Sequence, residues 1–172
     1  KAAAERAKQI VDEEWGHDLI RGWNKGWWKA PARVGDKIGQ LIGAAPGQVL
    51  VSDTTSINLF KLATAALTFQ PNKKRIITDA FNFPSDLYIL QGIQHLLSPS
   101  PYQGKGSGEG QYEIFRIGAM DDDITPNIAV LESAINENTA LVTLSHVVFK
   151  SGYLYDMQHI TELAHNKGAL VL

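Results

Sequence analysis

Two stretches decide the fold of this 172-residue chain: Val49-Leu-Val-Ser-Asp-Thr-Thr-Ser-Ile-Asn-Leu-Phe60 and Ile76-Ile-Thr-Asp-Ala-Phe-Asn-Phe-Pro-Ser-Asp86. Each begins with β-branched residues typical of a short strand, continues through a polar turn and enters a helical pattern. Further strands are predicted at 75–78, 113–117, 140–144 and 169–172, and helices at 56–69, 85–97, 126–136 and 157–166, the last two behind the caps Thr125 and Asp156. Strands that alternate with helices predict an α/β fold of three layers, in which helices flank a mostly parallel sheet.

The polar turn of the first stretch predicts an anion site. The first backbone N–H groups of a helix lack intrahelical partners, and the helix dipole adds partial positive charge there. Thr55 and Ser56 are therefore candidate phosphate ligands, and Thr54 is the expected helix cap. Ordinary capping of the helix explains the same hydroxyl residues without any ligand, so both interpretations stay open.

The second stretch presents an aromatic residue, Phe83, beside Pro84, Ser85 and Asp86. An exposed aromatic face next to a carboxylate suits a flat, polar heteroaromatic ring. The alternatives are a core position for Phe83 and a helix N-cap at Asp86. Ligands of parallel sheets bind beyond the carboxyl ends of the strands, so we expect residues 52–56, 80–86 and 145–151 to meet at one edge.

Composition excludes several classes of function. Sixteen basic residues stand against eighteen acidic ones, so the chain has no basic surplus for nucleic acid. The absence of cysteine excludes disulfides and thiolate metal sites and is compatible with a reducing cytoplasm. No apolar run approaches the ~20 residues of a membrane span. The five histidines show no metal-ligand spacing, so no metal is expected.

We expect two parts in the chain. Residues 1–48 read as an N-terminal helical segment with helices over 2–15 and 31–42, a first-turn Pro31, a C-terminal cap at Gly43, and an aromatic loop between them. Residues 49–172 read as the first part of an α/β domain. The first residues follow a helical pattern without a cap and the last ones a buried-strand pattern, so we interpret the chain as a fragment.

In the two stretches quoted first, 49–60 and 76–86, the chain resembles kynureninase, a pyridoxal-phosphate (PLP) enzyme of the aspartate-aminotransferase fold type. The resemblance continues through Trp15-Gly-His-Asp-Leu-Ile-Arg-Gly-Trp-Asn24, Pro31-Ala-Arg-Val-Gly-Asp-Lys-Ile-Gly39 and Ser145-His-Val-Val-Phe-Lys-Ser-Gly-Tyr-Leu-Tyr-Asp-Met157. It implies a three-layer α/β large domain of a PLP-dependent transferase, of which this chain is a part. It also implies cofactor contacts at these positions: Thr55, Ser56, Phe83, Pro84, Ser85, Asp86 and Ser145.

The resemblance also implies a substrate contact and a missing catalytic residue. Trp23 resembles the position that contacts the aniline ring of the substrate, where an aromatic would favour kynurenine over a hydroxylated analogue. The alternative is a tryptophan that only packs. The Schiff-base lysine would lie beyond Leu172, so we expect no catalytic residue and no activity in this chain alone. Lys150 is expected to be an exposed loop lysine, and His146 is not assigned a catalytic role.

The function implied by the resemblance is hydrolysis of L-kynurenine to anthranilate and L-alanine, in tryptophan catabolism and NAD biosynthesis. The implied protein is a cytoplasmic homodimer that binds neither nucleic acid nor membrane. One alternative is another PLP enzyme of the same fold type, such as a cysteine desulfurase or lyase. A second is a non-catalytic α/β module that binds a nucleotide phosphate at Thr55 and Ser56.

Overall fold

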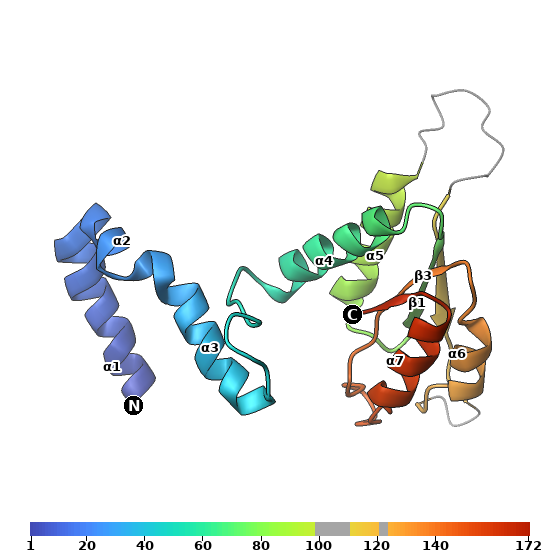
Figure 1. Ribbon diagram of the computed structural model, residues 1–172. Coiled ribbons are helices and arrows are strands. Elements are labelled where there is room, and N and C mark those ends of the chain that lie inside the picture. Colours follow the sequence, from blue (N-terminus) through green and yellow to red (C-terminus); the bar gives the residue numbers. More distant parts are fainter. Residues whose placement is uncertain (99–110, 121–123) are drawn as a thin grey trace. The chain divides into compact units, whose positions relative to one another are not determined.

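The computed structural model describes residues 1–98, 111–120 and 124–172. The chain divides into two compact units, Lys1–Asp53 and Thr54–Leu172. The first unit is helical and the second is α/β (Figure 1). Each unit is described by itself.

The α/β unit is built on a parallel sheet, as the sequence predicts. Its strands are β1 (Arg75–Asp79), β2 (Glu113–Ile117), β3 (Thr139–Val142) and β4 (Leu170–Val171). They lie in the order β2-β1-β3-β4, and all three pairings are parallel. The carboxyl ends of these strands therefore lie at the same edge of the sheet.

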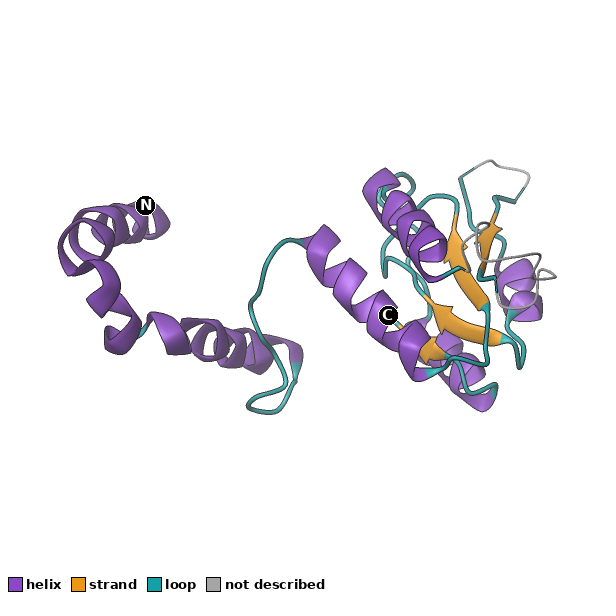
Figure 2. Ribbon diagram, turned by 90° about the horizontal axis from the view of Figure 1, so that it is seen from above, coloured by secondary structure: helices purple, strands orange, loops and turns teal. Residues whose placement is uncertain are grey.

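Helices cover both faces of this sheet (Figures 1 and 2). They are α4 (Thr55–Phe69), α5 (Pro84–Leu97), α6 (Ile128–Ala134) and α7 (Met157–Asn166). Successive strand residues point to opposite faces, so a sheet covered on both sides needs adjacent apolar residues. Ile76 packs in the core shared with α4 and α5, whereas its neighbour Ile77 packs in the core shared with α6 and α7. The predicted three-layer α/β architecture is confirmed.

Side-chain caps determine where several of these helices begin. Thr54 Oγ1 accepts a hydrogen bond from Ile57 N at 3.4 Å, and Asp156 Oδ1 accepts one from His159 N at 3.0 Å, as predicted. The predicted cap Thr125 is wrong, because Asn127 Oδ1 accepts from Val130 N at 3.1 Å and α6 starts at Ile128. Pro126 lies in an antiparallel bridge with Ala119, which keeps the backbone extended before the helix.

The helical unit begins with α1 (Ala2–Gln9), which continues as the π-helix η1 (Ile10–Asp18). Short turns follow: η2 (Leu19–Arg21), α2 (Gly22–Lys25) and η3 (Trp27–Lys29), so the predicted aromatic loop is partly helical. The longest helix of this unit is α3 (Ala30–Ile42), with Pro31 in its first turn and Gly43 at φ 75°, both as predicted. Within the described residues, no helix is long and apolar enough to cross a membrane.

The predicted strand at 49–51 is wrong. A β-strand forms only where a neighbouring strand completes its hydrogen bonds, and no described strand pairs with this segment. Instead it runs against α3: Val51 N donates to Pro31 O at 3.4 Å. A Cβ atom at Gly35 would lie only 1.9 Å from Val49 O, so this close approach requires the glycine.

Candidate functional site

A pocket of about 350 Å³ opens at the carboxyl edge of the sheet in the α/β unit. Its volume lies in the lower part of the range of about 300–1,000 Å³ typical of small-molecule sites. The start of α4, the loop between β1 and α5, and the end of β3 supply its walls: Thr55, Asn58, Leu59, Leu62, Asn82, Asp86, Thr143, Leu144, Ser145 and Leu172. Three candidate residues from separate parts of the sequence, Thr55, Asp86 and Ser145, are thus brought to one cavity.

The start of α4 provides donors at this pocket. Thr54 caps Ile57 N with its side chain, and Thr54 O accepts from Asn58 N at 2.9 Å. The amides of Thr55 and Ser56 precede these bonded groups at the positive end of the helix dipole. Thr55 is exposed and lines the pocket, whereas Ser56 is partly buried and does not line it.

Phe83, Pro84 and Ser85 lie beside the pocket without lining it. The Phe83 side chain is 55% exposed and packs on Phe149 at 5.3 Å between ring centroids, so it is not a core residue. Helix α5 starts at Pro84, which makes Asp86 a first-turn residue instead of the N-cap. Ser85 Oγ donates to Asp86 Oδ1 at 3.2 Å, which orients the carboxylate that faces the pocket.

Sequence reasoning missed Asn82, which connects two parts of the site. This side chain is only 6% exposed. Its Oδ1 accepts from Ser145 Oγ at 2.7 Å and from Phe83 N at 3.2 Å, and its Nδ2 donates to the buried Thr78 Oγ1 at 3.2 Å. Its position directly before Phe83 in the polar turn was the available signal, but nothing local indicated the partner Ser145, which follows β3.

A second buried group, Asp79, lies at the end of β1 and was also missed. The residue is 1% exposed, and its Oδ2 accepts from Tyr155 Oη at 2.9 Å, while Oδ1 has no hydrogen-bond partner. Burial raises the pKa of Asp79, and the hydrogen bond from Tyr155, together with the nearby backbone N–H groups of Phe81 and Asn82, opposes that rise. Burial, together with the Asp79 charge, raises the pKa of Tyr155. This pair supports the turn that precedes Phe83.

The residues after Ser145 do not enter the pocket. His146 is exposed, and its carbonyl accepts from Tyr155 N at 3.0 Å. Lys150 is exposed, as predicted, and its Nζ lies 5.8 Å from the centroid of the Phe149 ring. Within the described residues, no group of three or more His, Cys, Asp or Glu side chains is placed to hold a metal ion.

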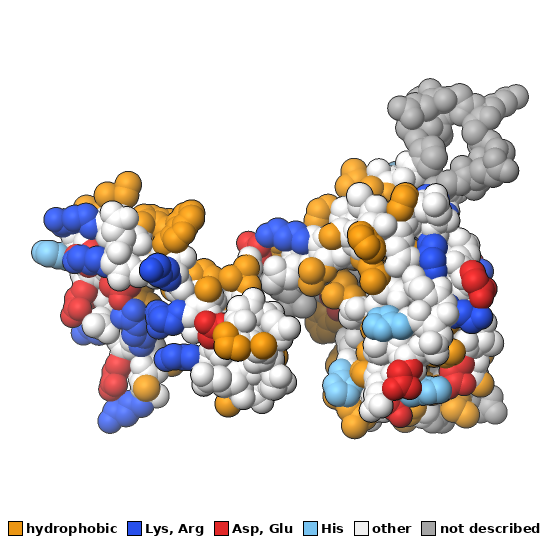
Figure 3. Space-filling view, viewed as in Figure 1, with side chains coloured by type: hydrophobic (Ala, Val, Ile, Leu, Met, Phe, Trp, Pro, Cys, Tyr) orange, Lys and Arg blue, Asp and Glu red, His pale blue; other side chains and the backbone are white. Residues whose placement is uncertain are grey.

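Trp23 belongs to the helical unit. Its side chain is 50% exposed and meets the rings of Trp27 and Trp28 edge-on, each at 6.0 Å between centroids. Figure 3 shows hydrophobic side chains on the surface of this unit beside lysines and arginines. Trp23 is therefore available for contact as well as packed against its neighbours.

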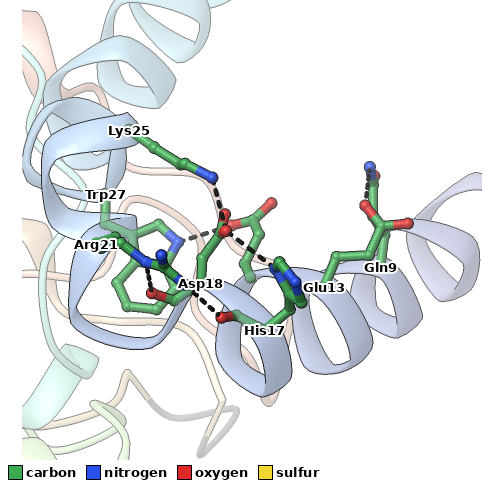
Figure 4. Close-up of polar contacts among 8 residues, drawn as sticks. Gln9, Glu13, His17, Asp18, Arg21, Lys25 and Trp27 are labelled. Atoms are coloured by element: carbon green, nitrogen blue, oxygen red, sulfur yellow. Dashed lines mark hydrogen bonds and ion pairs between the residues drawn. The ribbon is translucent and has the colours of Figure 1, made fainter.

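The helical unit has its own cavity, of about 810 Å³, which Trp27 lines and Trp23 does not. Polar contacts hold the turns around it (Figure 4): Trp27 Nε1 donates to Glu14 Oε2 at 2.6 Å, and Lys25 Nζ lies 2.6 Å from Asp18 Oδ1. The hydrogen bond from Trp27 and then that from Arg6 lower the pKa of Glu14. These four groups are thus used in bonds within the helical unit.

Comparison with known sequences shows which family this chain matches. Residues 29–172 match the family described as Aminotransferase class-V. A kynureninase of Pseudomonas fluorescens is 42% identical over 176 residues, which cover 99% of this chain and 38% of the relative. A kynureninase of Burkholderia pseudomallei is 41% identical over 177 residues, with coverage of 100% and 38%. The chain thus spans 38% of the length of these curated relatives.

Solved structures share the fold at low identity. A NifS-like protein superposes with a TM-score of 0.63 at 19% identity, covering 81% of this chain and 35% of that one. A cysteine desulfurase of Thermococcus onnurineus gives 0.64 at 20% identity, with coverage of 81% and 31%. The lyase C-DES with glycine covalently linked to its PLP cofactor gives 0.58 at 13% identity, with coverage of 98% and 39%.

These findings agree with the sequence-based expectations of fold and resemblance. The parallel sheet with helices on both faces is shared with the solved structures, and the kynureninases match the chain along its whole length. The match of residues 29–172 covers most of the sequence, and therefore this chain belongs to the aminotransferase class-V family.

Proposed function

We propose that the complete protein containing this sequence is a PLP-dependent kynureninase that hydrolyses L-kynurenine to anthranilate and L-alanine. The observation that carries the proposal is the convergence of Thr55, Asp86 and Ser145 on one pocket at the carboxyl edge of the sheet. The identity of 40–42% with proteins named kynureninase, along essentially the whole chain, supports the choice of reaction. The cysteine desulfurase and the NifS-like protein are 20% and 19% identical and support only the fold.

The residues that line the pocket and those beside it fit PLP. A phosphate needs donors, and the start of α4 offers the amides and hydroxyls of Thr55 and Ser56 where the helix dipole is positive. A pyridine ring needs a flat apolar face, and Phe83 is exposed beside the pocket. Asp86 and Ser145 in the pocket wall can interact with the polar groups of the ring.

Each of these side chains has a distinct task in the proposal. Thr55 and Ser56 hold the phosphate, and Phe83 stacks on the ring with Pro84 and Ser85 supporting the turn. Asp86 and Ser145 orient the polar edge of the ring. When bound, PLP supplies an electron sink for the carbanion charge of the substrate. The Schiff-base lysine is proposed to lie outside residues 1–172, so these residues provide binding and orientation.

Trp23 is proposed to contact the aromatic ring of the substrate. Its half-exposed face offers packing without a hydrogen bond, which would favour kynurenine over a hydroxylated analogue.

We further propose that the complete protein is a homodimer in the cytoplasm and serves tryptophan catabolism and NAD biosynthesis. The exposed aromatic surface of the helical unit supports the dimer, because such surfaces mark interfaces. Light scattering that gives a monomeric mass for the active protein would refute it.

The test is release of anthranilate, followed by its fluorescence, from L-kynurenine by the complete protein with and without added PLP. We expect turnover with kynurenine and none with L-cysteine. Conversion of L-cysteine to alanine and sulfane sulfur, which an added thiol reductant releases as sulfide, would identify a desulfurase instead. Binding of a nucleotide without binding of PLP would support a non-catalytic phosphate module. The 172-residue chain alone should release no anthranilate above a blank with free PLP.

A further inference from the structure

Asn82 occupies a buried position directly behind the proposed cofactor pocket, at the end of the turn between β1 and α5. It is 6% exposed, yet it lines the pocket with its remaining surface. A buried amide requires partners for its oxygen and its nitrogen. Asn82 has partners for both. Its oxygen accepts from Ser145, which lines the pocket, and from the backbone of Phe83, which lies beside it, and its nitrogen donates to Thr78.

The backbone N–H of Phe83 fixes the orientation of the Asn82 amide. A backbone N–H can only donate, so the Asn82 atom 3.2 Å from Phe83 N is the oxygen. The amide nitrogen then faces Thr78 Oγ1 at 3.2 Å, where a hydroxyl oxygen can accept. The orientation of the amide is thus determined by chemistry, and its oxygen is directed at both Phe83 and Ser145.

The same oxygen joins two segments that are far apart in the sequence. Ser145 Oγ, at the end of β3, donates to Asn82 Oδ1 at 2.7 Å across 63 residues. Because its hydroxyl hydrogen is used in this bond, Ser145 presents lone pairs to the pocket. The backbone of Phe83 and the hydroxyl of Ser145 are therefore positioned by one atom.

We infer that Asn82 is a positioning residue for the ring of the cofactor: it holds Phe83 and Ser145 in the relative placement that ring binding requires. The inference rests on the proposed function, because the ring is that of PLP. It separates ring binding from phosphate binding, since the hydrogen bonds of the Asn82 side chain go to Thr78, Phe83 and Ser145 and not to the start of α4.

The experiment measures two affinities of the complete apoprotein. Equilibrium dialysis gives the Kd for PLP, and competition gives the inhibition constant of inorganic phosphate. For Asn82→Ala we expect the Kd for PLP to rise about tenfold, the scale of one or two lost hydrogen bonds, with the phosphate constant unchanged. Asn82→Leu, which has a similar shape, should give the same result without leaving a cavity.

Thr78→Val is the matched control. It removes the hydrogen bond from Asn82 Nδ2 inside the buried part of the network and leaves both bonds to Asn82 Oδ1 in place. We expect this variant to melt at a lower temperature than the unsubstituted protein, with a Kd for PLP within about twofold of it. Loss of stability and loss of ring affinity are thereby separated.

Several outcomes would overturn the inference. An unchanged Kd for PLP in both Asn82 variants would remove its positioning role, and a parallel rise of the PLP and phosphate constants would make it a general structural residue. Failure of both variants to fold would likewise assign Asn82 to the fold. If the unsubstituted protein binds no PLP, the proposed function fails, and the inference fails with it.

Discussion

Replacement of Tyr155 by phenylalanine should destabilise the protein through Asp79. The two side chains are 2% and 1% exposed, and their hydrogen bond of 2.9 Å is the only side-chain bond of the Asp79 carboxyl in the described structure. Phenylalanine keeps the ring and removes only the hydroxyl, so packing is preserved. Since Asp79 Oδ1 already lacks a partner, loss of the Tyr155 bond would leave the carboxyl without any side-chain donor. A hydrogen bond to a charged group contributes about 1.5–3 kcal/mol, and we expect a loss of about 2 kcal/mol at a pH above the raised pKa of Asp79, where the carboxyl is ionised.

The stability that Asp79 contributes should depend on pH, and the direction follows from its raised pKa. Burial raises the pKa of Asp79 above the ordinary value of 3.8, so the unfolded chain releases this proton first as the pH rises. Stability contributed by Asp79 is therefore highest below pH 3.8 and decreases from there through the raised pKa of the folded state. Tyr155→Phe removes a bond that lowers this pKa, so the decrease should extend to higher pH. Asp79→Asn carries no titrating proton and should abolish this part of the pH dependence.

The assay is urea unfolding of the complete protein, followed by circular dichroism from pH 4 to pH 8, in a double-mutant cycle of Tyr155→Phe and Asp79→Asn. In the Asp79→Asn background the tyrosine hydroxyl meets a neutral acceptor, so its removal should cost only about 1 kcal/mol. A cost of Tyr155→Phe below ~0.5 kcal/mol, the scale of an ordinary surface substitution, would refute the reasoning. Equal costs in the two backgrounds at a pH where the Asp79 carboxyl is ionised would also refute it.

Three further predictions concern single residues. Gly35→Ala should destabilise the helical unit by more than about 2 kcal/mol in thermal unfolding, because the added Cβ would lie 1.9 Å from Val49 O. As a control, Gly92→Ala should be neutral or stabilising, because a Cβ added there would meet no neighbouring atom within 4 Å. Phe83→Ala should raise the Kd for PLP about tenfold without lowering the melting temperature, since the ring is 55% exposed; unchanged affinity with a collapsed melting temperature would make Phe83 a core residue. Trp23→Ala should raise KM for kynurenine in steady-state assays, and unaltered KM and kcat would exclude this residue from the substrate site.

The amino-acid sequence by itself determined the layers of the α/β unit. Adjacent apolar residues such as Ile76 and Ile77 require a sheet that is covered on both faces, and this requirement is visible in any short window. The helix starts capped by Thr54 and Asp156 could also be predicted from the sequence, because a cap acts on amides only a few residues away. The cap at Asn127 was missed because the bridge that keeps Pro126 extended involves a second segment.

Only the tertiary structure decided which polar groups meet. Ser145 and Asn82 are 63 residues apart, and Tyr155 and Asp79 are 76 apart, so no local pattern indicates either pair. The segment at 49–51 shows the same dependence: its β-branched residues favour a strand, but it lies against α3 and no described strand pairs with it. Propensity and capping depend on a few neighbouring residues, whereas strand pairing and buried hydrogen bonds depend on which distant segments the fold brings together.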